Sequence, residues 1–150
     1  MEEVNIGFVL GFVAGEGCFT VNIREQAGNI YALPSFALSV NERDEAIVQE
    51  LCDLTGLGSV NYRRGGMVAW VISSREECQT FADQLRSAME GTLFSVTEKS
   101  NQLERWVEFM EKYETPKTDE EVRTVVERAK AVNPDSQNGM SVEEWVGRNE

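Results

Sequence analysis

The stretch from Gly7 to Phe19, GFVLGFVAGEGCF, constrains the fold more than any other part of the sequence. Apolar residues between Ile6 and Val13 cover nearly all sides of a helix, so this helix must be buried on more than one face. Glycine recurs at every fourth position and forms one stripe, where missing side chains let another backbone come close. The stripe consists of Gly7, Gly11 and Gly15.

Two partners suit this glycine stripe. One is another segment of the same chain, and the other is a second copy of the helix related by a twofold axis. In the second case two helix C-termini, and two copies of Glu16, lie side by side. Backbone carbonyls already make that end negative, and a second carboxylate adds repulsion. A divalent cation bound by carboxylate oxygens and a carbonyl such as that of Gly15 resolves the conflict.

From Gly17 onward the apolar period changes from that of a helix to two, which predicts strands. A first strand is expected from Gly17 to about Arg24 and a second from about Tyr31 to Asn41, joined by a turn. Asn5 is expected to cap the preceding helix. The next predicted elements are a helix at Asp44–Thr55, ended by Gly56, and strands at Ser59–Arg63 and Met67–Ser73. A capping box of Ser74 and Glu77 then predicts a helix that continues to about Met89.

A further helix is expected from about Thr97 to Tyr113, and two capping boxes predict two short helices near the C-terminus. The chain is therefore expected to be an α+β protein with an αββαββα order and a four-stranded antiparallel sheet. We expect an N-terminal domain over residues 1–114 and an acidic helical tail over residues 115–150. The tail helices are expected to be solvated surface without chemistry.

Composition narrows the possible chemistry. The chain has no histidine, which excludes histidine-based triads and metal sites and leaves carboxylates, lysine, arginine and bound metal. Its three cysteines suggest reduced thiols, and we expect a soluble, cytoplasmic protein. The net charge of -12 argues against nucleic acid, because phosphate contacts need Lys and Arg. That objection weakens if the surface is adapted to high salt, so a halophilic source is a hypothesis.

The residues from Val9 to Gly17, followed by Cys18 and Phe19, resemble the motif of the LAGLIDADG homing endonucleases, particularly the single-copy form. The similarity extends over about Asn5 to Tyr113. It includes the order of elements, the phrase SVNERDEAIVQEL at Ser39–Leu51, and the strand entry after it. The resemblance implies a site-specific, metal-dependent endonuclease of intron or intein homing, active as a homodimer that makes double-strand breaks in DNA.

The resemblance also assigns roles to residues. It implies that the motif helices form the dimer interface along Gly7, Gly11 and Gly15, and that two sheets form a saddle over DNA. It implies that Glu16 and the carbonyl of Gly15 bind Mg²⁺, and that Lys99 is similar to a basic residue of the catalytic pocket. Ala14 stands where family members often carry an acid, a departure expected to affect helix termination more than chemistry.

Period two places polar side chains together on one face of the predicted sheet. A sheet face can enter the major groove, where arginine reads guanine and asparagine reads adenine. The same alternation also describes an ordinary solvated sheet face. The candidate DNA-binding residues are Thr20, Asn22, Arg24, Ser39, Asn41, Asn61 and Arg63, with Ala37, Ser59, Met67 and Ala69 beside them.

Two other functions stay open. One is a catalytically silent relative that binds nucleic acid, such as an RNA maturase or a regulator. The other is a small acidic dimerisation domain without a nucleic-acid partner, which the net charge favours. Retention of Glu16 argues against the silent relative.

Overall fold

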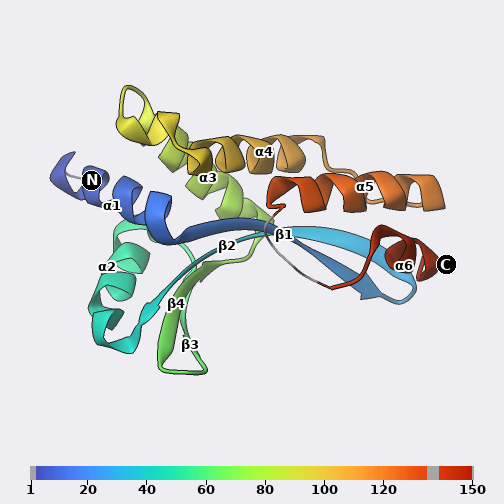
Figure 1. The fold of residues 1–150 in the computed structure, drawn as a ribbon, viewed down its shortest axis with the longest axis horizontal. Helices are drawn as coiled ribbons and strands as arrows, with labels where there is room; N and C mark the ends of the chain where they lie inside the picture. The colour runs from blue at the N-terminus through green and yellow to red at the C-terminus, as the bar shows by residue number, and fades with distance from the viewer. Residues whose placement is uncertain (1–2, 135–138, 150) are drawn as a thin grey trace.

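The structure, a computed structural model, describes residues 3–134 and 139–149. The order of elements is the predicted αββαββα followed by further helices, which confirms the α+β fold (Figure 1). The elements are α1 (Glu3–Glu16), β1 (Gly17–Gln26), β2 (Asn29–Asn41), η1 (Glu42–Asp44), α2 (Glu45–Thr55), β3 (Ser59–Arg63), β4 (Met67–Ile72), α3 (Arg75–Met89), η2 (Leu93–Val96), α4 (Glu98–Lys112), α5 (Asp119–Val132) and α6 (Val142–Gly147).

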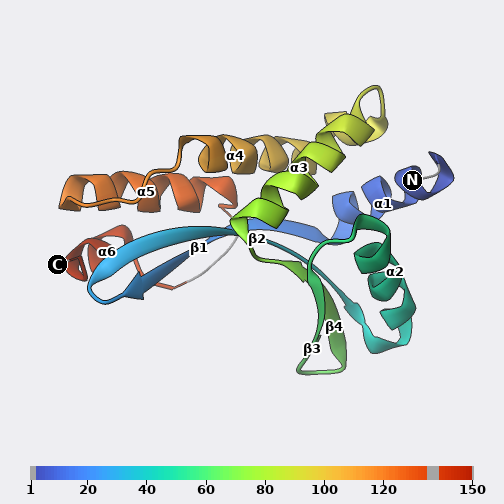
Figure 2. The same ribbon diagram turned by 180° about the vertical axis from the view of Figure 1, so that it is seen from behind.

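The four strands form one antiparallel sheet in the order β1-β2-β4-β3. β1 and β2 make a long hairpin, and β4 joins β2 only along its last part, from Phe36 to Asn41. Helices α3, α4 and α5 lie on one side of the sheet, and the strands curve into an open arch on the other side, as the two opposite views agree (Figures 1 and 2). One face of the sheet is therefore covered and the other is free along the arch.

The covered face holds an aromatic core. Phe19 of β1 packs against Phe36 of β2 and Trp106 of α4, with ring centroids 5.0 and 4.9 Å apart. Trp70 of β4 meets Phe36 and Phe81 edge-on. All five rings are at most 1% exposed. Burying side chains of this size supplies most of the driving force for folding such a domain.

Two local expectations need correction. Helix α1 already runs through Asn5 from Glu3, so the predicted cap at Asn5 is wrong. Ser74 does accept a hydrogen bond from the Glu77 amide, but the Glu77 carboxylate accepts from Gly58 instead of closing a capping box. That contact ties the start of α3 to the turn before β3, where Gly58 has a φ of 75°. The Glu77 carboxylate thus binds the distant Gly58 amide instead of the Ser74 amide at the start of its own helix.

The C-terminal helices are more than solvated surface. Val122, Val126, Ala129 and Val132 of α5 are buried, and α5 packs against α4 and the β1–β2 hairpin. Helix α6 packs on α5 and begins with a complete capping box of Ser141 and Glu144. The expectation of a wholly solvated tail is therefore wrong for this apolar face. Among the described residues, no helix is both long enough and apolar enough to cross a membrane.

Candidate nucleic-acid interface and helix-end site

The glycine stripe of α1 has no packing partner within the described part of the chain. Gly7, Gly11 and Gly15 are exposed, and a Cβ atom built on any of them would meet nothing within 4 Å. The opposite side of the helix is buried through Val9, Leu10 and Val13. Of the two partners that the sequence allows, the intramolecular one is therefore not realised in this structure.

Apolar surface continues beside the stripe. A groove of about 670 Å³ runs between α1 and the connection that leads from α3 to η2, and its wall includes Gly7, Gly11 and Ala14. Near it, Phe8 of α1 is 52% exposed, and Leu93 and Val96 of η2 are 84% and 79% exposed. Exposed apolar side chains beside a groove are typical of an interaction site.

Glu16 is the last residue of α1 and its side chain is exposed. The next residue, Gly17, is buried, and a Cβ there would lie 2.7 Å from the carbonyl oxygen of Val13 and 2.9 Å from the Phe36 ring. Only glycine fits between the helix end and the core. The close packing of Gly17 therefore positions Glu16 at the junction between α1 and β1.

Helix α4 supports this junction through three side chains on one of its faces. Lys99 donates a hydrogen bond to the carbonyl of Gly17. Gln102 accepts one from the Phe19 amide at 3.1 Å, and the Trp106 indole donates to the Thr20 carbonyl at 2.9 Å. Because β1 is an edge strand, the contacts of Lys99 and Gln102 satisfy backbone groups on the side of β1 that no strand pairs. Lys99 is thus bonded to the residue that follows Glu16 in the chain. The chemical role of Lys99 stays a prediction.

The donors at the helix end suit a hard divalent cation. Glu16 offers carboxylate oxygens, and Gly15 lies in the last helical turn, whose carbonyls have no partner further along the helix. Oxygen donors of both kinds are what Mg²⁺ and Ca²⁺ bind. Over residues 3–134 and 139–149, the structure contains no group of three or more acidic, cysteine or histidine side chains close enough to share a metal ion.

The predicted DNA-binding residues share the free face of the sheet. Ser39, Ala69 and Asn61 lie in one row across β2, β4 and β3, and Asn41, Met67 and Arg63 form the next row. Arg63 donates a hydrogen bond to the Ser39 hydroxyl at 3.3 Å. The Asn41 side chain accepts from the Arg43 amide and so caps η1. Thr20, Asn22 and Arg24 continue the face along β1.

Sequence reasoning missed part of this face. Tyr31 pairs with Arg24 and Leu33 pairs with Asn22, so both side chains join the candidate interface, and Leu33 is 47% exposed. The predicted strand starts at Tyr31, and its alternation puts Tyr31 and Leu33 on the face opposite to that of buried Ala32. The alternation of the strand therefore indicated both residues, but an exposed leucine and a half-buried tyrosine are not the polar side chains by which such a face is recognised in a sequence.

The charge is segregated between strands and helices. All four strands together contain two arginines, Arg24 and Arg63, and one acid, Glu25. The other acids of the described residues lie in helices and connections, so the net charge of -12 does not describe the sheet face. A local surface with no excess of acids can meet phosphate even in an acidic protein, since salt screens distant charges.

The thiols differ in their surroundings. Burial raises the pKa of the Cys78 thiol to about 12, and burial likewise raises the pKa of Cys52. Cys18 is half-buried on β1, on the face opposite Phe19, and its sulfur accepts a hydrogen bond from the Asn133 amide group at 3.2 Å. Cys18 thus lies within the candidate interface, two residues beyond Glu16.

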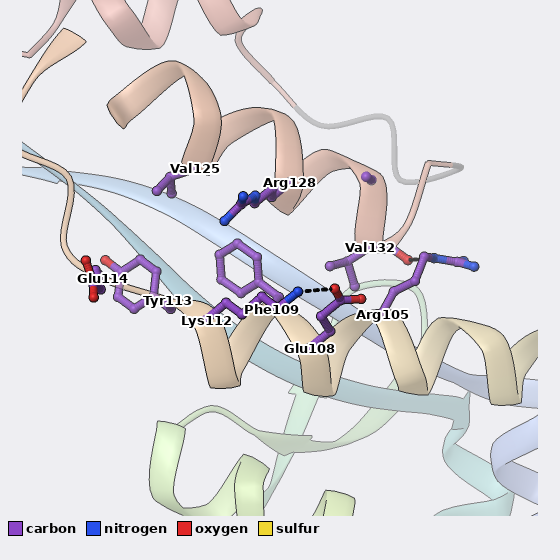
Figure 3. Close-up of a pocket in the computed structure, with 10 residues that line it drawn as sticks. Arg105, Glu108, Phe109, Lys112, Tyr113, Glu114, Val125, Arg128 and Val132 are labelled. Atoms are coloured by element: carbon purple, nitrogen blue, oxygen red, sulfur yellow. Dashed lines mark hydrogen bonds and ion pairs between the residues drawn. The ribbon is translucent and has the colours of Figure 1, made fainter. Parts of the chain in front are cut away.

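A second hollow, of about 210 Å³, lies between α4 and α5 (Figure 3). Phe109 and Tyr113 stack in its wall, and Lys112 donates to the Glu108 carboxylate at 2.6 Å on its rim. Arg105 donates to the Val132 carbonyl at 3.3 Å and so joins the two helices. None of the predicted site residues lines this hollow, which is separate from the candidate interface.

The free sheet face and the exposed acid at a glycine-lined helix end define a candidate nucleic-acid-binding protein of the α+β class. A family model described as "LAGLIDADG endonuclease" matches residues 9–110, which include the helix end, the whole sheet and α4 up to Met110. This chain therefore belongs to the LAGLIDADG endonuclease family. No curated protein matches the sequence closely enough to count as a relative.

Solved structures share the fold. The archaeal intron-encoded homing endonuclease I-Vdi141I, complexed with DNA, is 17% identical with a TM-score of 0.75, and the match covers 99% of this chain and 96% of that one. The homing endonuclease I-CvuI, complexed with the I-CreI target in the presence of Mg with the DNA not cleaved, is 16% identical with a TM-score of 0.76, over 97% and 94%. The LAGLIDADG meganuclease I-AabMI, bound to uncleaved DNA, is 19% identical with a TM-score of 0.72, over 96% of this chain but 48% of that one.

Proposed function

We propose that this protein is a site-specific DNA endonuclease that acts as a homodimer, requires a divalent metal ion and makes double-strand breaks. One observation carries the proposal: an open glycine stripe runs along the exposed side of α1 and leads directly to an exposed acid, Glu16. Membership of the LAGLIDADG endonuclease family supports the nuclease activity. Intron or intein homing would be the biological setting.

The geometry of α1 supports the proposed homodimer. Two copies of the helix can approach closely where Gly7, Gly11 and Gly15 leave the backbone bare. Exposed Phe8 and the neighbouring groove would be covered in the same contact. The match to I-AabMI supports this arrangement, because one copy of this chain corresponds to about half of that single chain. A twofold dimer implies a target that is roughly palindromic.

The dimer brings the two Glu16 carboxylates to the same place, with the Gly15 carbonyls beside them. These groups would hold Mg²⁺, which when bound lowers the pKa of an attacking water and stabilises charge on the leaving oxygen. The tight packing of Gly17 would fix the backbone from which each carboxylate projects. Lys99 anchors the same junction, and in the proposed complex its positive charge would stabilise the scissile phosphate.

The free face of the sheet would read double-stranded DNA. Arg24 and Arg63 suit guanine, and Asn22 and Asn61 suit adenine, in the major groove. The absence of acids other than Glu25 from the four strands supports this assignment over a dimerisation domain with no nucleic-acid partner. The acidic helices keep the halophilic hypothesis in place, so binding is best measured over a range of salt concentrations.

The test compares wild type with Glu16→Gln on a plasmid that carries the DNA flanking the gene, at several salt concentrations with Mg²⁺. Wild type should linearise the plasmid, and Glu16→Gln should bind it equally but cut roughly a thousandfold more slowly or worse, since it loses a metal-binding charge. Glu50→Gln, which neutralises an exposed acid on α2, is the matched control and should cut normally.

Each other outcome points to a different function. Equal cutting by wild type and Glu16→Gln would remove Glu16 from the mechanism. Binding without cutting by the wild type would indicate the catalytically silent relative. No binding at any salt concentration would leave the dimerisation domain.

A further inference from the structure

The β1–β2 hairpin extends beyond the rest of the sheet. Its ladder runs from Gly17↔Leu38 to Gln26↔Asn29, whereas β4 pairs with β2 only from Phe36 onward. Residues 20–26 of β1 and 29–35 of β2 therefore form a two-stranded extension. A two-stranded ribbon is only marginally stable in water unless something packs against one of its faces.

Helices α5 and α6 supply that packing. Ile30 of the extension forms a separate small core with Val122 and Val126 of α5, all three 0% exposed. Ile23 packs against this core from β1, and Trp145 does so from α6. At the tip, Arg148 forms an ion pair with Glu25 at 3.5 Å. Figure 2 shows α5 and α6 alongside the hairpin, beyond the ends of β3 and β4.

The opposite face of this extension carries the outer part of the candidate interface. Asn22 pairs with Leu33 and Arg24 pairs with Tyr31. Because side chains alternate between the two faces of a strand, support on one face positions the side chains on the other. Nine residue steps separate Gly17 from Gln26, so the tip lies about 30 Å along β1 from the helix end. DNA advances about 3.4 Å per base pair, so the extension would read base pairs well away from the cut.

We infer that α5 and α6 determine which outer base pairs of the target are recognised, by fixing the shape of the β1–β2 extension. Val126 and Trp145 are then positioning residues, which act through Ile30 and Ile23 rather than by touching DNA. The inference about DNA rests on the proposed function. The mechanical support of the hairpin by the two helices does not depend on it.

Amide hydrogen exchange of the full-length chain tests the support itself. Val126→Ala should speed exchange of the hairpin amides between residues 20 and 33 roughly tenfold, since it removes two buried methyl groups from the small core. Val125→Ala is the matched control: the neighbouring valine packs against the main core on the α4 side, so hairpin exchange should stay at the wild-type rate. Unchanged exchange in Val126→Ala, or equal acceleration in both variants, would overturn the inference.

Sequence selection from a library of randomised duplexes, with Ca²⁺ in the binding buffer, tests the consequence for DNA. Wild type should enrich a two-part site. Val126→Ala and Trp145→Ala should lose preference at the outer positions and keep it near the centre, and Trp145→Phe should restore it. The inference would be overturned if the variants lost preference equally at all positions, or if they kept the wild-type preference everywhere. Failure of wild type to enrich any sequence would instead count against the proposed function, and the exchange result would still decide on the support.

Discussion

Helices α1 and α5 have the same length, 14 residues, but they complete their packing in different ways. Helix α5 is amphipathic: one face buries Val122, Val126 and Ala129, and the other exposes charged side chains to water. Helix α1 is apolar on nearly every side, yet Phe8 and the three-glycine stripe lie open. Helix α5 thus buries its apolar face within one chain, whereas the exposed side of α1 would be covered only in the proposed dimer.

The two helices also end at the same place. Cys18 lies two residues beyond α1, and Asn133, the residue after α5, donates a hydrogen bond to its sulfur. The end of α1 presents Glu16 for the proposed chemistry, and the end of α5 contacts β1, the strand that follows α1. The difference teaches that apolar character by itself does not locate a core, because a helix that is apolar and also lined with glycine can keep one side free for association.

The largest expected effect comes from filling the stripe. Gly11→Leu should leave the monomer folded, because a Cβ atom at this exposed position meets nothing within 4 Å in the described chain, but it should disrupt the proposed dimer. Each copy would bring one added leucine into the interface, so the dimer would be overpacked twice. Its dissociation constant should therefore rise by roughly a hundredfold or more, and cleavage should fall with it. Sedimentation velocity and circular dichroism measure the two properties separately.

The matched control lies on the exposed side of α5. Thr124→Leu adds a similar side chain to a helix that has no missing partner, so the association state should not change. A dimer that survives Gly11→Leu would show that α1 and α5 are alike and that the glycine stripe has no partner in solution.

The reverse experiment truncates the buried face of α5. Val122→Ala should cost about 2 kcal/mol of unfolding free energy, because the valine is 0% exposed and its loss leaves a cavity. Dimerisation should be unaffected, since Val122 packs against Ile30 of the β1–β2 extension and not against α1. Urea denaturation gives the first quantity and sedimentation gives the second. Weaker dimerisation in this variant would break the proposed division of labour between the helices.

Thiol labelling sharpens the comparison where the two helix ends meet. Cys78 should resist alkylation at pH 8, because burial raises its pKa to about 12 and thiolate is the reactive form. Half-buried Cys18 should be modified several-fold faster, and bound DNA should protect it, as it lies on the free sheet face. Mass spectrometry of labelled peptides follows both residues. A labelling rate of Cys18 that is the same with and without DNA would show that the nucleic acid does not bind at this face.

The smallest effect concerns the attachment of α6 to α5. Arg123 donates hydrogen bonds to Glu143, including one of 3.1 Å, and this bonding lowers the pKa of the Glu143 carboxyl from its usual 4.5. A lowered pKa in the folded state means that the pair stabilises the protein above about pH 4.5 and that this stabilisation is lost as the pH falls further. Glu143→Gln should therefore be slightly less stable than wild type at pH 7 and equal to it at pH 3. Thermal melts at both values compare them, and a difference that persists at pH 3 would point to another cause.

Much of the fold could be predicted because its signals are local. The change of period at Gly17 marks the end of α1, and Gly56, with a φ of 71°, ends α2 as its position suggested. The glycine stripe and Glu16 were also visible as a pattern, because four-residue spacing places side chains on one side of a helix.

The remainder depends on contacts between distant residues, which no local pattern reveals. Lys99, Gln102 and Trp106 reach the free edge of β1 across more than 80 positions of sequence. Their spacing fits one helix face, but nothing local shows that β1 is an edge strand. The small core of Ile30, Val122 and Val126 could not be predicted for the same reason, because Ile30 is distant from the two valines in the sequence. The acidic composition of the C-terminal helices suggested solvent, although their valines recur at helical spacing.

Chemical cross-linking at position 16 tests the central claim that two copies of α1 bring two acids together. A Glu16→Cys, Cys18→Ser double variant is treated with a short bismaleimide, and a Glu127→Cys, Cys18→Ser variant, labelled on the exposed side of α5, is the control. We predict a covalent species of twice the 16.9 kDa chain mass from the first protein and none from the second. Equal cross-linking of the two proteins, or none at position 16 over the salt range in which the protein is folded, would contradict the account.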